Sequence, residues 1–183
     1  EKLSENGMEL VELSLPDICE YQSPTIQTIL AAEIAAVHAE LFTERRADYS
    51  PQIRSLIEVG RLLPATDYLR ALRVRRRYQR ELKHLFDQCD VLISPGALGS
   101  APQGLDYTGD PVLSAGWTLA DFPTLSLPAT LDSDDMPIGI QLTGPPNADL
   151  FVLEVGKLVE EVIGFDYRPT LKNSLVQGGG CRQ

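Results

Sequence analysis

The chain has 183 residues, of which 43% are hydrophobic and 23% are charged, and 26 Asp and Glu against 16 Lys and Arg give a net charge of −10. An acidic balance of this size repels phosphate backbones, so it excludes a nucleic-acid partner except at a local patch. No apolar run approaches the roughly 20 residues that span a bilayer, so no membrane partner is predicted.

The cysteines and histidines argue against disulfides and metals. Cys19, Cys89 and Cys181 are odd in number and form no CxxC pair, which is typical of free thiols in a reducing compartment. His38 and His84 have no partner at metal-ligand spacing. We therefore expect no metal, no cofactor and a cytoplasmic location.

The first part of the chain predicts two helices after a strand. Residues 1–6 are typical of the end of a helix, with Gly7 in the left-handed cap, and a strand is expected over residues 8–15. A chain that opens in this way is expected to be a fragment or a processed product. A helix follows over residues 25–45, on a stripe of Ile26, Ile29, Leu30, Ile34, Val37 and Leu41. A shorter helix is expected over residues 51–60.

Residues 66–88 carry the clearest amphipathic pattern. The apolar face is made of Ala71, Val74, Tyr78, Leu82, Leu85 and Cys89. The opposite face carries Arg70, Arg73, Arg76, Arg77 and Arg80. Because the whole chain is acidic, this basic run favours a solvated helix face over a nucleic-acid surface. Arg75 lies at the apolar edge, and we expect it to pair with Glu33, since buried charges need partners.

The last part of the chain predicts three strands and a helix. Strands are expected over residues 90–95, 124–131 and 137–143, and "DSDDMP" favours a polar hairpin turn over a calcium loop. A helix is expected from Asn147 as its N-cap to Gly164 as its stop. Helices interleaved with apolar strands predict an α/β fold with a largely covered sheet. Residues 174–183 are expected to be a flexible tail after a domain at 1–173.

No complete catalytic set is visible in the residues themselves. P-loop, GxGxxG, HExxH and GxSxG motifs are absent. His38 and His84 fall inside predicted helices, where a structural or surface role is favoured. Cys89 is favoured as a core residue, and Cys19 has no activating base beside it in the sequence.

The segment "TGDPVLSAGWTLADFPTLSLPA", residues 108–129, fits neither a regular helix nor a strand. Its glycines and prolines fix irregular backbone, which is typical of pocket walls. Trp117 offers an apolar face and one N–H donor, and Ser114 with the backbone near Gly109 and Gly116 can orient a polar group. The alternative is that Trp117 fills the core between a helix and the sheet.

Three motifs in order give the chain a resemblance to a known family. The stretches are "DVLISPGALGSAP", "TGDPVLSAGWTLADFPTLSLPA" and "MPIGIQLTGPPNADLFVLEVGKLVEEVIG". Together with the upstream helices they resemble the closing part of the amidase signature family, over residues 8–164. The resemblance implies part of an α/β/α sandwich of the amidase-signature type, with a mixed sheet covered by helices.

The resemblance also implies hydrolysis of a carbon–nitrogen amide bond. Such enzymes use a nucleophilic Ser, a second Ser in a cis peptide and a Lys, with an oxyanion bound by a Gly/Ser-rich loop. That loop is missing, and no lysine precedes such a loop, the chain's lysines being Lys2, Lys83, Lys157 and Lys172. The chain is therefore expected to lack the catalytic residues and to supply a wall of the substrate pocket. By resemblance, the substrate-binding residues are Asp110, Ser114 and Trp117.

The expected partner is a small amide substrate, bound together with a missing N-terminal half, and a homo-oligomer is possible. The segment resembles general amidases more than glutamine-using amidotransferases. The alternative function is a stand-alone, non-catalytic binding or interaction domain derived from an amidase. A stand-alone enzyme with Ser114 or Cys19 as nucleophile is a weaker alternative.

Overall fold

The computed structural model describes residues 1–168, and the predicted tail at 174–183 lies outside them. The α-helices are α1 (Lys2–Glu5), α2 (Gln22–Val37), α3 (Ala39–Arg45), α4 (Pro51–Leu62), α5 (Ala65–Lys83), α6 (Val112–Ala120) and α7 (Asp149–Ile163). The 3-10 helices are η1 (Asp17–Tyr21), η2 (Arg46–Asp48) and η3 (His84–Asp87). The strands are β1 (Leu92–Pro95), β2 (Thr124–Leu131) and β3 (Pro137–Thr143).

The three strands form one antiparallel sheet in the order β1-β3-β2, so β3 is central and β1 and β2 are edges. All three predicted strands are confirmed, as is the α/β class. The predicted polar turn joins β2 to β3, where the Asp132 carboxylate accepts the N–H of Asp134 at 2.8 Å and of Met136 at 2.9 Å. Within residues 1–168 all strand pairing is antiparallel, so no parallel partner of a mixed sheet is present.

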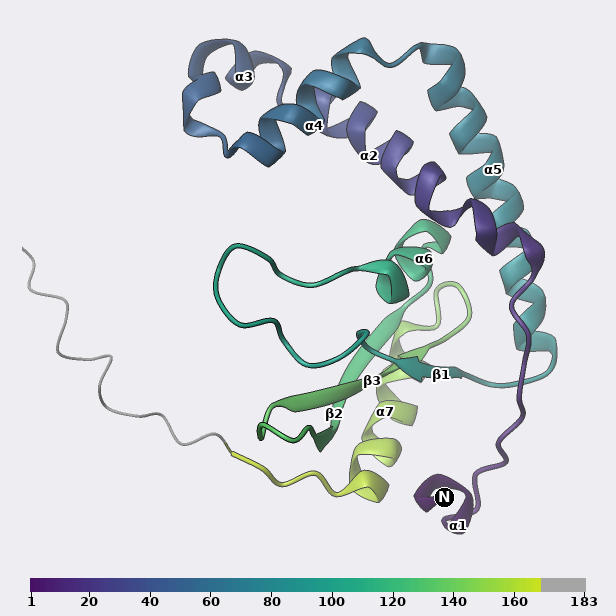
Figure 1. Cartoon of the computed structure of the whole chain (residues 1–183). Coiled ribbons are helices and arrows are strands. Elements are labelled where there is room, and N and C mark those ends of the chain that lie inside the picture. Colours follow the sequence, from purple (N-terminus) through teal and green to yellow (C-terminus); the bar gives the residue numbers. More distant parts are fainter. Residues whose placement is uncertain (169–183) are drawn as a thin grey trace, which may run out of the picture.

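Helix α7 covers one face of the sheet (Figure 1). Leu127 and Leu142 from the sheet pack against Val152 and Val159 of this helix in one buried cluster. At Gly156 the helix approaches so closely that an added Cβ would lie 2.1 Å from Leu125 Cδ2. The predicted helix end is confirmed, because Gly164 caps α7 in the left-handed conformation with φ of 61°.

Helices α2, α5 and α6 form a second layer with its own core. Buried side chains from these helices and their flanks make one cluster of Ile18, Ile29, Ala71, Tyr78, Leu82, Leu85, Trp117, Leu119, Ala120 and Phe122. The predicted apolar face of α5 is therefore confirmed at Ala71, Tyr78, Leu82 and Leu85, whereas Cys89 is half-buried and lies outside the cluster, so its prediction as a core residue was wrong. The five predicted surface arginines of α5 lie outside this buried cluster, as a solvated helix face requires.

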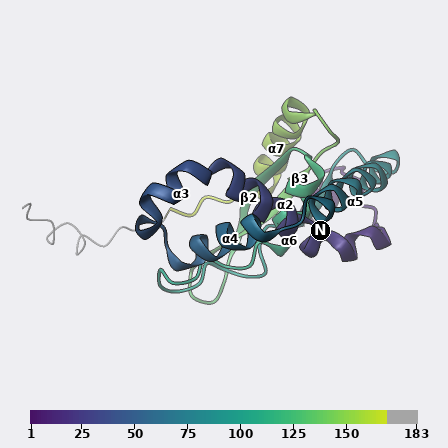
Figure 2. The ribbon, with the colours of Figure 1, turned by 90° about the horizontal axis from the view of Figure 1, so that it is seen from above.

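Helices α3 and α4 form a lobe that projects away from α7 and the sheet (Figure 2). The lobe has a separate small core of Ala35, Phe42 and Ile57. Helix α4 meets α2 at Gly60, where a Cβ would lie 1.8 Å from the Ala31 carbonyl oxygen. The lobe therefore depends on a backbone-to-backbone contact that only glycine permits.

Three predicted elements differ in the structure. Residues 8–15 are extended but belong to no strand, because β-pairing needs a neighbour and none lies beside them in the described chain. The helix predicted over 25–45 is divided at His38, whose Nδ1 lies 2.9 Å from the Tyr49 hydroxyl oxygen. The irregular segment 108–129 contains α6, so the prediction that it forms no helix was wrong.

The predicted stripe of α2 and the predicted cap of α7 also need correction. Val37 is 79% exposed and Leu30 is 50% exposed, whereas small residues such as Ala31 are buried at the contact with Gly60. Hydrophobic periodicity overlooks this arrangement because a close helix contact buries small side chains. Asn147 has a positive φ of 63° and is not the N-cap of α7, which is Ala148.

The predicted Glu33–Arg75 pair is wrong. Arg75 pairs with Asp121, at 2.5 Å between Nη2 and Oδ2. The Glu33 carboxylate accepts a hydrogen bond of 3.1 Å from the Tyr68 hydroxyl instead. Arg75 and Glu33 therefore each have a partner, but not the partner that the sequence analysis predicted.

Among the described residues no single helix is long and apolar enough to cross a membrane. One bent pair, Asp17–Val37 with Ala39–Asp48, passes the test by length and composition only, with 68° between its halves.

We expect Gly60→Ala to lower the free energy of unfolding by about 2 kcal/mol or more, because the new methyl group forces α4 away from α2. Urea titration followed by circular dichroism measures this change. Gly99→Ala is the matched control, since nothing lies within 4 Å of a Cβ at Gly99. Equal effects of the two substitutions would contradict the proposed contact.

Candidate functional site

The segment singled out in the sequence borders a hollow of about 760 Å³. Three parts of the chain enclose it: the loop after β1, the start of α6 and one face of the sheet. The lining residues are Gly96, Ala97, Leu98, Gly99, Ser100, Ala101, Pro102, Tyr107, Thr108, Gly109, Asp110, Pro111, Ser114, Ser126, Pro137 and Gly139. Two of the three predicted site residues, Asp110 and Ser114, are therefore brought together here.

Asp110 and Ser114 both shape the first turn of α6. The Asp110 carboxylate accepts the N–H of Val112 at 2.9 Å, and the Ser114 hydroxyl donates to the Pro111 carbonyl oxygen at 3.1 Å. A carboxylate at this place satisfies a backbone donor that the first turn leaves free. Both hydrogen bonds lie at the exposed surface, so each side chain is available to a molecule in the hollow.

Trp117 lies on the other side of α6 and does not line this hollow. It is 9% exposed and belongs to the core cluster of α2, α5 and α6. It borders a different hollow of about 240 Å³ together with Leu13, Leu85 and Leu92. The structure thus places Trp117 where the alternative interpretation put it, between a helix and the sheet.

A polar contact beneath α6 holds this helix in place. The Gln22 side-chain amide donates to the Val112 carbonyl oxygen at 2.7 Å, and the Tyr78 hydroxyl donates to Gln22 Oε1 at 3.3 Å. A Cβ at Gly116 would lie 2.5 Å from Gln22 Oε1 and 2.7 Å from the Tyr78 hydroxyl. Burial, followed by the nearby Cys19, raises the pKa of Tyr78 far above its ordinary value, so the phenol stays a donor.

The other end of α6 is fixed by Arg75 and Gln79 from α5. Arg75 Nε donates to the Leu119 carbonyl oxygen at 3.0 Å, and Gln79 Nε2 donates to Asp121 Oδ2 at 3.3 Å. Asp121 also pairs with Arg75 and ends the helix in the left-handed conformation, with φ of 59°. Helix α6 is therefore held at both ends by side chains of α2 and α5.

The sheet contributes Ser126, Pro137 and Gly139 to the floor of the hollow. Ser126 and Gly139 line it, and Gln141 and Thr143 lie on the same face because side chains two residues apart on a strand share a face. Gln141 is 2% exposed and Thr143 is 1% exposed. In the described part of the chain, Gln141 Nε2 and Thr143 Oγ1 have no hydrogen-bond partner. Sequence reasoning missed both, although polar residues alternating with Ile and Leu in β3 were a visible signal.

The Asp132 carboxyl of the β2–β3 turn is affected by a residue of the loop that borders the hollow. The Ser100 hydroxyl, with the N–H groups of Met136 and Asp134, holds the pKa of this carboxyl below its ordinary value. Ser100 also lines the hollow.

Asp110 is the only carboxylate among the described lining residues of the hollow. None of its described lining residues is a lysine, histidine or cysteine. Burial raises the pKa of the Cys19 and Cys89 thiols, which keeps both protonated and weakly nucleophilic. Among residues 1–168 no group of three or more His, Cys, Asp or Glu side chains can hold a metal ion.

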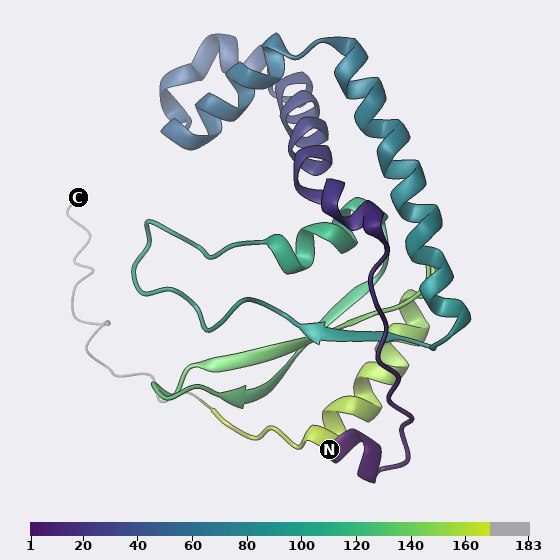
Figure 3. The ribbon, with the colours of Figure 1, turned by 45° about the vertical axis from the view of Figure 1, so that its right-hand side comes forward.

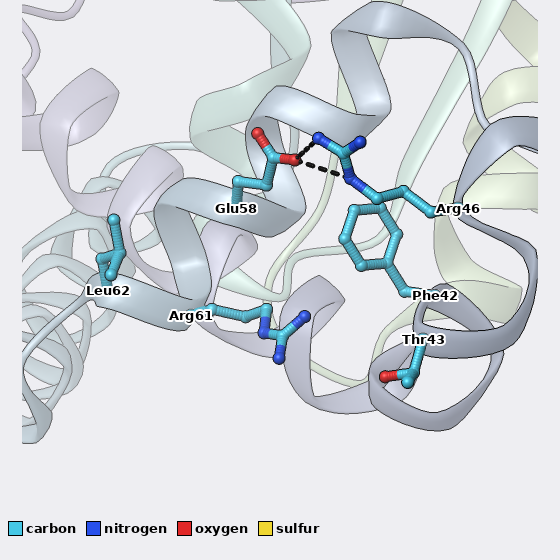
Figure 4. A pocket seen from close by; sticks show the side chains of 6 residues that line it. All are labelled: Phe42, Thr43, Arg46, Glu58, Arg61 and Leu62. Carbon is cyan, nitrogen blue, oxygen red and sulfur yellow. Dashed lines mark hydrogen bonds and ion pairs between the residues drawn. The ribbon is translucent and has the colours of Figure 1, made fainter.

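A separate hollow of about 590 Å³ lies in the α3–α4 lobe (Figure 4). Its lining residues are Phe42, Thr43, Arg46, Glu58, Arg61 and Leu62. The Arg46 guanidinium hydrogen-bonds the Glu58 carboxylate and lies 5.9 Å from the Phe42 ring centre. Glu58 neutralises Arg46, and Arg61, the remaining charged residue of the lining, is an exposed side chain, so we assign no anion site to this hollow.

Comparison with known proteins identifies relatives of most of the chain. The family model described as "Amidase" matches residues 1–153. An amidase of Pseudomonas putida is 30% identical, with 92% of this chain and 38% of the relative covered. A glutamyl-tRNA(Gln) amidotransferase component of Rhizorhabdus wittichii is 28% identical, with 92% of this chain and 40% of the relative covered.

Solved structures give the same result. A crystal structure of an amidase superposes with a TM-score of 0.76 at 27% identity, and the match covers 87% of this chain but 39% of the amidase. The chain thus spans about two fifths of the length of the relatives it matches. The amidase and the amidotransferase component are similar to it to nearly the same degree, so identity does not separate these two groups.

We expect Gly116→Ala to destabilise the chain by roughly 1–2 kcal/mol, because the methyl group displaces Gln22 and breaks its hydrogen bond to Val112. Tyr78→Phe removes one of the two atoms that the methyl group meets. In a double-mutant cycle read by urea unfolding, the cost of Gly116→Ala should fall by at least about 0.5 kcal/mol in the Tyr78→Phe background. Strictly additive costs would contradict this contact.

Proposed function

The chain belongs to the amidase family, and from this premise we propose that it forms one wall of the substrate cleft of a hydrolase that cleaves a carbon–nitrogen amide bond. In this proposal residues 1–173 are the amidase-like portion, and the Ser-Ser-Lys catalytic residues come from the remaining part of the domain. The single observation that carries it is the hollow: it is bordered by residues 108–111 and Ser114, and among its described lining residues there is no lysine and no base other than Asp110.

The positions of the lysines support the proposal that the catalytic residues come from the remaining part of the domain. Lys2 Nζ donates to the Ile163 carbonyl oxygen at 2.8 Å, so it is held at the end of α7. Lys83 and Lys157 lie on α5 and α7 and do not line the hollow, and Lys172 lies outside the described residues. A serine hydroxyl is a weak nucleophile until a base removes its proton. Ser114 has no such base among the described lining residues that contact it, so we assign it to binding.

We assign different roles to the three predicted site residues. Ser114 orients a polar group of the substrate through its hydroxyl, which lies at the surface of the hollow. Asp110 holds the first turn of α6 in shape through Val112 and thereby fixes the backbone that faces the substrate. Trp117 anchors α6 in the core from the opposite side, so it is a positioning residue.

The size of the hollow supports a small-molecule substrate. The volume of about 760 Å³ suits a small-molecule amide. The proposal includes self-association of the chain into a homo-oligomer.

The proposed function predicts that the 183-residue chain alone hydrolyses no amide above background. Co-expression with the part of the Pseudomonas putida amidase that this chain does not match should restore turnover. In that complex Ser114→Ala should raise KM about fivefold to tenfold with little change in kcat, because one hydrogen bond to bound substrate is worth about 1 kcal/mol.

Thr118→Ala is the matched control, since Thr118 is a hydroxyl residue of the same helix that does not line the hollow. Turnover by the purified chain alone would contradict the proposal. Binding of amides by the isolated chain without turnover in any complex would favour the alternative of a stand-alone binding domain.

A further inference from the structure

One further hollow, of about 520 Å³, lies between α5, the end of α6 and the loop that joins β3 to α7. Figure 3 shows this loop beside the lower half of α5. The hollow shares no described lining residue with the hollow of the proposed function. Its charged lining residues are Arg76, Arg80, Lys83 and Asp121, and we call it the basic hollow.

Three cations of α5 face the basic hollow together. Arg76, Arg80 and Lys83 are four and three residues apart, so their side chains share one side of the helix. All three are exposed. Arg76 and Lys83 are separated by roughly 10 Å along the helix axis, at 1.5 Å per residue. This short span places the three charges around one small ligand.

These cations have no carboxylate partner in the part of the chain that the structure describes. No ion pair within residues 1–168 includes Arg76, Arg80 or Lys83. By contrast, Arg77, which follows Arg76 in the sequence, pairs with Glu81. Like charges four residues apart on a helix repel each other. In a chain with a net charge of −10, the basic hollow is therefore a local reversal of charge that a bound anion stabilises.

The carboxylate in the lining does not cancel this charge. Asp121 Oδ2 lies 2.5 Å from Arg75 Nη2 and accepts a hydrogen bond of 3.3 Å from Gln79 Nε2. Arg75 does not line the basic hollow, so Asp121 is neutralised without using any of the three lining cations. Asp149, in the first turn of α7, does not line it either.

The loop before α7 adds a polar group to the lining. Asn147 lines the basic hollow and is exposed, and its φ is 63°. An asparagine carboxamide carries two N–H donors, which suit the oxygens of an anion. The lining thus joins donors from a helix and from a loop that are far apart in the sequence.

The geometry points to an anion site: we propose that the basic hollow binds the phosphate group of a small soluble molecule, either free phosphate or a phosphate monoester. A guanidinium donates two parallel N–H bonds to two phosphate oxygens, and a lysine adds a third positive charge. A volume of about 520 Å³ leaves room for an organic part beside the phosphate. The inference goes beyond the proposed function and does not depend on it.

A nucleic-acid backbone does not fit the basic hollow. Such a partner is bound by cations spread along many phosphates, whereas these three span roughly 10 Å. The acidic remainder of the chain repels a long polyanion. The hollow of the α3–α4 lobe shows the contrast within this molecule, because Glu58 neutralises Arg46 there.

Isothermal titration calorimetry of the 183-residue chain tests the site. The probes are inorganic phosphate and glycerol 3-phosphate, at an ionic strength held constant with KCl because salt screens exposed charges. We expect saturable binding with a Kd below about 1 mM. Arg76→Gln and Arg80→Gln should each weaken binding about tenfold, because each removes charge-assisted donors.

Arg70→Gln is the matched control. It removes the same charge from the same helix, but Arg70 does not line the basic hollow and its side chain is 77% exposed. We expect it to change Kd less than about twofold, since an exposed charge outside the hollow is screened. Circular dichroism confirms that each variant is folded. Equal weakening by Arg70→Gln and Arg80→Gln would show a general attraction of anions to α5 and would overturn the site.

Other probes identify a different occupant. Vesicles of phosphatidylcholine with phosphatidic acid test a lipid headgroup, and a hexaglutamate peptide tests an acidic protein surface. Binding to the vesicles alone, or tighter binding of the peptide than of either phosphate probe, overturns the proposal. So does the absence of saturable binding of both phosphate probes up to about 10 mM. None of these results bears on amide hydrolysis, so the proposed function stands or fails separately.

Discussion

The close approach of α6 to α2 and α5 at Gly116 determines the arrangement around the hollow. Gln22 and Tyr78 occupy the space that any side chain at Gly116 would need, and Gln22 uses that position to hold the Val112 carbonyl. The helix is thereby oriented with Trp117 in the core and Ser114 toward the hollow. Because Gly116 has no side chain, the packing of the helical layer and the shape of the candidate site depend on each other.

Local patterns predicted the parts of the fold whose partners are near in sequence. Strands β2 and β3 pair across a short turn, and the long amphipathic helix α5 buries the face that its periodicity marks. The strand expected over residues 8–15 has the right residue types but no neighbour in the described chain, since β-propensity reflects packing against a partner. The buried face of α2 escaped prediction because a distant glycine, Gly60, determines it by its contact with Ala31.

The site was predictable only in part for a similar reason. The unusual composition of residues 108–114 drew attention to Asp110 and Ser114, and both line the hollow. Trp117 is in the same stretch of sequence but faces the core, because successive residues of α6 are rotated by about 100° around the helix axis. Ser126 lines the hollow from the sheet, and its place there depends on the strand register, which no short motif records.

The lobe of α3 and α4 is the part of the described chain in which we expect sequence changes to affect the hollow least. Its core of Ala35, Phe42 and Ile57 is separate from the two larger clusters, and it reaches them through α2. We expect a unit with its own small core to open locally before the rest of the chain unfolds. Insertions and exchanges can therefore accumulate in its connecting turns without disturbing the hollow, provided that Gly60 keeps its place against Ala31.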